Sequence, residues 1–328
     1  MDFLSLAFMQ RALLTAGLAG LTSPAIGTYI VQRRLSLLGD GLGHVAIAGV
    51  GLALLTGLAP LPAAVAVCVV GAVAIEFLRQ RGQTSGDIGL AILFYGGLSS
   101  GVLMASAAGR GAGALQAYLF GSLTTVSWGD LKLVCALTLV VLVFAVGQSR
   151  QLFAICADED YARVIGLKVQ LYNYLIVVLA AVTVTTAMRT VGLLLVSALM
   201  VVPVATAQNL CHGFFAGLWG AMGIGLVVAL GGVVAAYWAD LAPGALIVVG
   251  SIALYVLSWP VAALSHRRRR RRIDQTDPTA LPHRPTGDEH AHVHGPDCGH
   301  SALEHGDHLD YIHAGHRHAP HQGHYDEH

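Results

Sequence analysis

The feature that most constrains this chain is a series of apolar stretches that recur from its first residues to Ser265. A helix needs about 20 mostly apolar residues to cross a bilayer. Charged residues make up 12% of the chain, whereas they make up about a quarter of a soluble chain. The pattern therefore predicts an all-α polytopic membrane protein, a bundle of eight to nine transmembrane helices. The predicted spans cover residues 11–32, 41–59, 61–79, 87–107, 130–148, 170–188, 190–210, 214–236 and 241–262.

Arginine and lysine residues predict the orientation, because they accumulate in cytoplasmic loops. They fall on alternate connections of the nine-span count, which places the N-terminus outside and the C-terminal tail in the cytoplasm. The count falls to eight if the first segment is interfacial or if 170–210 divides differently. Segment 112–126 is too short and polar to span, so we expect a re-entrant or surface helix there. The basic residues are Arg33, Arg34, Arg79, Arg81, Arg150, Arg163, Lys168 and Arg267 to Arg272.

Composition divides the chain into a transmembrane domain, residues 1–265, and a histidine-rich tail, residues 266–328. The tail contains several prolines and few apolar residues, so we expect it to be disordered without metal. Three His-x-x-His units begin at 305, 313 and 321, and imidazole-rich tracts suit zinc, copper or nickel. The candidate tail ligands are His290, His292, His294, Cys298, His300, His305, His308, His313, His316, His318, His321, His324 and His328.

The most informative stretch inside the membrane domain runs from Ser36 to Leu55 and contains Asp40 and His44. Residues four apart lie on one face of a helix, so this carboxylate and imidazole could share one divalent ion. Ionisable groups within a membrane are costly and mark functional sites. The structural alternative is that Asp40 caps the helix while His44 bonds to a neighbouring helix.

The charged interior loop, residues 157–168, predicts a short surface helix. Asp158 or Asp160 can cap that helix, and Gly166 suits the position just after its end. Such a helix could bind a partner protein or could simply connect two membrane spans.

Several catalytic classes are excluded by the motifs. The chain contains no phosphate-binding loop, no dinucleotide fingerprint, no H-E-x-x-H helix and no serine–histidine–acid grouping. Nothing indicates a nucleic-acid partner or a tightly bound cofactor. We therefore expect a protein that is not itself an enzyme. Glu76 is a secondary candidate for a functional charge, because it is the deepest other carboxylate.

Four stretches together resemble the membrane permeases of ATP-binding-cassette importers for zinc, manganese or iron. They occur in the family's order between about residues 8 and 262. The family motif usually has a small residue and a serine between the aspartate and histidine, where this chain has Gly41 and Gly43. The stretches are RRLSLLGDGLGHVAIAGVGLAL, LQAYLFGSLTTVSWGDL, DEDYARVIGLKV and MRTVGLLLVSALMVVPVATA.

The resemblance implies a permease subunit in a prokaryotic plasma membrane, working as a homodimer. Its implied partners are two cytoplasmic ATP-binding subunits, which hydrolyse ATP, and an extracytoplasmic metal-binding protein. It also implies that Asp40 and His44 bind the transported ion and that the loop couples to the ATPase. The expected coupling residues are Asp158, Glu159, Asp160, Tyr161, Ala162 and Gly166.

The ion and the energy source remain open to alternatives. Two Asp/His pairs from a dimer would suit tetrahedral Zn²⁺, so Zn²⁺ is the expected substrate and also the expected tail ligand. Mn²⁺ prefers more oxygen ligands and is the second expectation, with Fe²⁺ behind it. Two other functions are a secondary metal transporter driven by an ion gradient and a membrane metal sensor.

Overall fold

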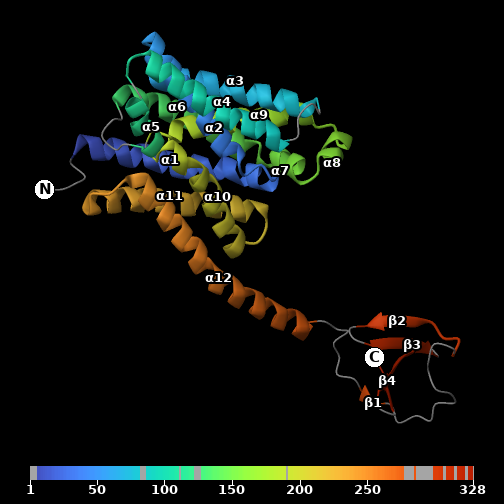
Figure 1. Cartoon of the computed structure of the whole chain (residues 1–328). Helices are drawn as coiled ribbons and strands as arrows, with labels where there is room; N and C mark the ends of the chain where they lie inside the picture. Colours follow the sequence, from blue (N-terminus) through green and yellow to red (C-terminus); the bar gives the residue numbers. More distant parts are fainter. Residues whose placement is uncertain are drawn as a thin grey trace. The chain divides into compact units, whose positions relative to one another are not determined.

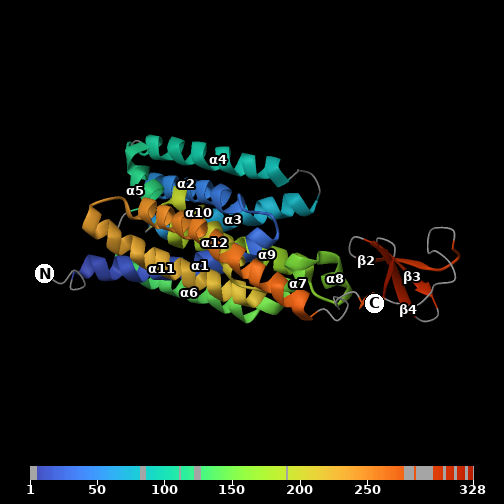
Figure 2. The same ribbon diagram turned by 90° about the horizontal axis from the view of Figure 1, so that it is seen from below.

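The computed structural model describes residues 6–81, 86–110, 112–121, 127–189, 191–276, 284–285, 298–305, 308–313, 316–321 and 324–327. The chain divides into two compact units, Met1–Val261 and Ala262–His328. The first unit is the helical bundle in Figures 1 and 2. The second contains the tail.

Nine long helices in the described residues correspond one by one to the predicted spans. Eight are long and apolar enough to cross a membrane, and the ninth, α10, is shorter by that measure. This confirms the expected bundle of eight to nine helices. They are α1 (Ala7–Gln32), α2 (Leu38–Thr56), α3 (Pro60–Gln80), α4 (Gly86–Ala107), α6 (Trp128–Gly147), α9 (Val169–Ala187), α10 (Leu193–Leu210), α11 (Phe214–Ala239) and α12 (Pro243–Thr276).

Helix α2 lies inside the bundle, in contact with α3, α4, α9 and α10. In α1 and α2, 78% of the apolar span is buried, compared with 22% in α4. Small residues explain the tight packing, because they let helix backbones approach closely in lipid. A Cβ added to Gly51 would lie 2.5 Å from the backbone oxygen of Gly101, and one added to Gly49 would lie 2.5 Å from Ala64.

Short helices occupy the two ends of the bundle. Within 112–126, the structure gives a 3₁₀ turn (Ala112–Leu115) and α5 (Gln116–Phe120), and residues 122–126 lie outside the described residues. Gly192 packs against this segment, since a Cβ there would lie 2.4 Å from the carbonyl carbon of Phe120. Helices α7 (Ser149–Ala157) and α8 (Glu159–Val164) lie together at the opposite end (Figures 1 and 2).

Only part of the tail lies within the described residues, so the expectation that it is disordered without metal stays a prediction. Its described residues form an antiparallel sheet in the order β1-β5-β4-β3-β2. Each glycine-containing His-x-x-His unit joins two neighbouring strands, so that His305 pairs with His308 in the backbone register. The strands are β1 (Arg284–Pro285), β2 (Ala302–His305), β3 (His308–His313), β4 (His316–His321) and β5 (His324–Glu327).

Gly97→Ala should destabilise the bundle, whereas Gly96→Ala should not. A Cβ on Gly97 would lie 2.6 Å from the backbone carbon of His44, whereas one on Gly96 meets nothing within 4 Å. Overpacking costs about 1–3 kcal/mol, while alanine favours an exposed helix over glycine by about 1 kcal/mol. Thermal unfolding of both purified variants in detergent checks this, and an equal loss of stability in both would contradict the packing argument.

Candidate functional site

Asp40 points from α2 toward α10 rather than capping its own helix. The residue that caps α2 is Leu37, which makes no side-chain cap bond, and Asp40 lies in the first turn. The Oγ of Ser197 in α10 donates to Asp40 Oδ1 over 3.1 Å. The carboxylate therefore has a fixed neighbour on another helix and keeps further lone pairs for a cation. The simple N-cap interpretation does not describe this geometry.

His44 is buried one turn further along α2, with 4% of its surface exposed. Its Nδ1 lies 3.1 Å from the backbone oxygen of Asp40. A carbonyl oxygen only accepts, so this contact places the ring proton on Nδ1 and leaves a lone pair on Nε2. The ring of Phe94 in α4 stacks on the imidazole at 3.8 Å between centroids. Backbone and aromatic contacts thus fix the ring in a state that suits metal ligation through Nε2.

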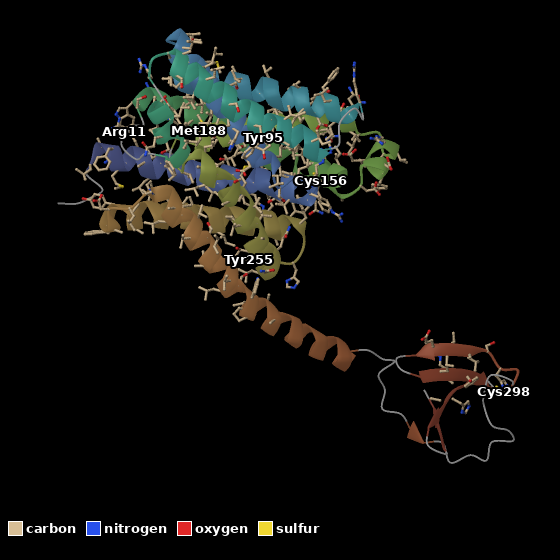
Figure 3. The ribbon with its side chains drawn as sticks, viewed as in Figure 1. Arg11, Tyr95, Cys156, Met188, Tyr255 and Cys298 are labelled. Carbon is tan, nitrogen blue, oxygen red and sulfur yellow. The ribbon has the colours of Figure 1, made fainter. Side chains whose placement is uncertain are left out.

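The pair lies near the middle of the bundle, because His44 packs against Gly97, which is close to the midpoint of α4. Asp40 lines a cavity of about 270 Å³ between α2 and α4. Leu37 and Tyr95 of its wall are 67% and 68% exposed, and Figure 3 labels Tyr95 on α4. The aspartate therefore faces an opening on the α4 side of the bundle, and Phe94 belongs both to this wall and to the stack on His44.

One copy of the chain offers two ligands here. Among the residues that the structure describes, no group of three or more histidine, cysteine, aspartate or glutamate side chains could bind a metal. Glu76, the secondary candidate, is engaged elsewhere: Arg79 Nε donates to its carboxylate over 2.8 Å and Gln80 Nε2 over 2.9 Å. Glu76 is thus neutralised within α3, which is the expected arrangement for a buried carboxylate with a structural role.

The loop 157–168 contains the short helix that the sequence predicts. Asp158 caps α8, and its Oδ1 accepts from the backbone nitrogens of Asp160 and Tyr161 at 2.9 and 3.0 Å. Gly166 ends the turn with φ of +85°, a conformation that favours glycine. The cap and the stop signal both act as expected, so α8 is a defined element and not a flexible connection.

Of the remaining residues in this loop, some contact the helical bundle and others are exposed on its surface. Ala162 is fully buried against Ile155 and Val169, which fixes α8 to the bundle. Glu159 forms an ion pair with Arg33 at the end of α1. On the outer surface, Asp160 pairs with Arg163. The apolar side chains of Tyr161, Val164 and Ile165 are 59%, 85% and 50% exposed. We call these three residues the α8 apolar surface.

Three important contacts were not predicted from the sequence. Ser197 lies inside the stretch MRTVGLLLVSALMVVPVATA, so its place in a recognised motif was a usable signal. The stack of Phe94 on His44 and the ion pair between Arg33 and Glu159 join distant segments, and the sequence contains no local pattern that pairs them.

The tail ligand candidates are only partly within the described residues. His290, His292, His294 and His328 lie outside them. Cys298 and His300 are described, and His318 lies in β4. The register pairs His305 with His308, His313 with His316 and His321 with His324. The structure thus brings six candidates together in pairs at the backbone level.

Residues 5–262 match the ABC 3 transport family. The chain belongs to this family. It is 33% identical to a "Probable metal transport system membrane protein" of Treponema pallidum, over 77% of this chain and 95% of that protein. It is 32% identical to the "Manganese transport system membrane protein MntC" of Halalkalibacterium halodurans, over 79% of this chain and 88% of that protein.

The fold of the chain also matches a solved structure. The solved structure of PsaBC from Streptococcus pneumoniae in complex with Fab matches with a TM-score of 0.72 and 27% identity, over 79% of this chain and 93% of that chain. The resemblance seen in the four motifs is therefore confirmed. The chain is the membrane permease of an ABC-type metal transport system, a multi-pass plasma-membrane protein and not itself an enzyme. Membership in an ABC family favours ATP-driven transport over the gradient-driven alternative.

Proposed function

We propose that this permease imports a divalent transition metal and that Asp40 and His44 are its ligands on the path. The observation that carries the proposal is the geometry of the pair. A carboxylate fixed by Ser197 and an imidazole fixed through Nδ1 lie one helical turn apart, next to an opening between α2 and α4. Preoriented oxygen and nitrogen donors in the middle of an apolar bundle suit a metal ion in transit.

The functional unit in this proposal is a homodimer. A second copy that packs on the α4 side would bring another Asp40 and His44, giving two oxygen and two nitrogen donors. Helix α4 offers an apolar surface for such contact, since Ile88, Ile92 and Tyr95 are all more than half exposed. Because the ion must also leave, we expect weaker binding than at a closed structural site.

Asp40→Asn or His44→Ala should abolish uptake while leaving membrane insertion and ATPase binding intact. Ser197→Ala should reduce uptake less severely, about 10-fold to 100-fold, because it removes a residue that orients a ligand. Ser251→Ala is the matched control, since within the described residues its hydroxyl donates to the carbonyl of Ile247 in its own helix and to no other group. Uptake of radiolabelled metal into cells that depend on this permease measures the effect, and normal uptake in both ligand variants would sink the assignment.

Zn²⁺ is the proposed substrate on the chemistry of the donor set, because imidazole and carboxylate donors in equal number suit tetrahedral zinc. Mn²⁺ is the second candidate, and a specific observation favours it: a similar relative is named a manganese transport protein. Manganese would need further oxygen donors, for which the Ser197 hydroxyl is available near Asp40. Uptake of each labelled ion, with the other as unlabelled competitor, decides between them.

The partners in this proposal are two cytoplasmic ATP-binding subunits and an extracytoplasmic metal-binding protein. The loop 157–168 would lie on the cytoplasmic side and bind the ATPase, and three features support that. Helix α8 is capped by Asp158, fixed to the bundle by Ala162, and presents the α8 apolar surface outward. An exposed apolar patch on a fixed element is a common docking feature.

Val164→Ser should weaken the association of the ATP-binding subunit without unfolding the permease. Val164 is 85% exposed, so the substitution removes apolar contact area on the surface and no packing in the core. Leu171→Ser on α9 is the control, because Leu171 is also exposed, at 62%, but lies outside α8. Co-purification of the ATPase with each full-length variant is the measurement. If both variants retain the ATPase equally, loop 157–168 is only a connector.

The histidine-rich tail is proposed to bind Zn²⁺ reversibly in the cytoplasm and to slow import when the metal is abundant. The backbone register supports this, since each His-x-x-His unit pairs its two histidines across neighbouring strands. A passive zinc buffer is the alternative.

A chain truncated after Arg272 should still transport, because the Asp40/His44 pair and α8 are retained. It should also continue to import when cytoplasmic zinc is already high, whereas the full chain slows. Initial uptake rates at matched expression, before and after zinc loading, test this. If both chains slow equally, the regulatory role fails and only the buffer role survives.

A further inference from the structure

A second pocket, of about 470 Å³, lies where the ends of α1 and α3 meet the connection between α7 and α8. Three arginines line it, namely Arg33, Arg34 and Arg79, together with Cys156 and the carboxylate of Glu159. It shares no lining residue with the Asp40 cavity. The pocket is thus separate from the Asp40 cavity, and three of its lining residues are basic.

The charges around this pocket do not cancel. Glu159 pairs with Arg33, and Glu76 binds Arg79 through Nε at 2.8 Å and Nη2 at 2.9 Å. Among the described residues, Arg34 makes no ion pair, which leaves one excess positive charge. Cys156 does not offset it, because burial, with a smaller contribution from Glu159, raises the pKa of its thiol to about 12 against the opposing effect of Arg33. The thiol therefore stays neutral.

Arg33 has a hydrogen-bond donor without an acceptor. Its side chain is 5% exposed, and Nη1 is buried with no hydrogen-bond partner in the part of the chain that the structure describes. A buried unpaired donor is unfavourable, and more so when it carries charge. Arg34 next to it has φ of +58°, which is uncommon for a residue other than glycine. An oxygen acceptor inside the pocket would satisfy Arg33 Nη1.

The position of the pocket along the membrane-spanning helices indicates which kind of molecule supplies that acceptor. Arg33 and Arg34 directly follow the last residue of the α1 span, and Arg79 lies in the last turn of α3. On α3, Phe77 and Leu78 are 44% and 38% exposed, so the apolar surface of this helix extends to the pocket. Span ends with arginines lie at the level of lipid headgroups, where basic pockets between helices bind acidic lipids.

We propose that this pocket binds the phosphodiester of an anionic phospholipid. Phosphate oxygens are the acceptors that guanidinium groups bind best. A phosphodiester carries one negative charge, which matches the single excess positive charge of the site, whereas a phosphate monoester carries nearly two near neutral pH. The acyl chains would lie along the exposed apolar surface of α3.

Native mass spectrometry of the purified full-length permease, titrated with phosphatidylglycerol or phosphatidylcholine, tests the proposal. Arg34→Gln should weaken phosphatidylglycerol binding about fivefold, the factor expected for one arginine near a membrane surface. Arg34→Lys should retain most of the affinity because it keeps the charge. Arg150→Gln is the control, since Arg150 is exposed in the first turn of α7 and does not line the pocket. Phosphatidylcholine should not saturate the site.

Four outcomes would overturn the proposal. Equal losses in Arg34→Gln and Arg150→Gln would mean that general surface charge, and not the pocket, determines the binding. Displacement of phosphatidylglycerol by millimolar inorganic phosphate would assign the pocket to a free anion. Release of the lipid when the ATP-binding subunits assemble would assign it to the subunit interface. Unchanged binding in Arg34→Gln, with thermal unfolding also unchanged, would remove the pocket from lipid binding altogether.

Discussion

Close packing at glycines between α2 and its neighbours is the constraint on which the rest of this bundle depends. In lipid there is little hydrophobic drive to bring helices together, so close packing supplies much of the attraction. Gly97 approaches the backbone of His44, and Gly43 accommodates Leu193, whose Cδ1 would lie 2.5 Å from an added Cβ. These two contacts bring α4 and α10 against the same turn of α2. The proposed metal ligands can therefore be oriented by residues from both helices.

The cost of burying Asp40 and His44 explains the details of their surroundings. Each polar atom that leaves water must find a partner. The carboxylate receives the Ser197 hydroxyl, and the imidazole donates to the carbonyl one turn earlier. These partners still leave lone pairs on Asp40 and on Nε2 of His44. A structural ion pair such as Glu76 with Arg79 leaves much less capacity for an ion. This difference distinguishes a proposed transport site from a buried charge that serves stability.

Much of the architecture could be predicted from the sequence because hydropathy acts locally along the chain. The nine predicted spans match nine long helices in the described residues. Gly166 was recognised as the end of α8, and Asp158 is the one of the two candidate caps, Asp158 and Asp160, that caps it. The partners of the candidate site were harder to find. Ser197 reaches Asp40 from 157 positions away, and Phe94 comes from α4, so only the packing of the bundle brings them together.

The ion pair between Arg33 and Glu159 has a mechanical consequence. Arg33 ends α1, and the chain enters α2 at Leu38, two residues before Asp40. Glu159 belongs to the first turn of α8 and also accepts from Asn173 of α9 over 3.3 Å. The short helix is therefore connected by a few rigid steps to the start of the helix that carries the proposed ligands. A displacement of α8 that leaves the ion pair intact must move the side chain of Arg33, which lies just before the segment that leads to Asp40. The ion pair thus connects α8, at one end of the bundle, to the segment that leads into the helix of the proposed metal ligands.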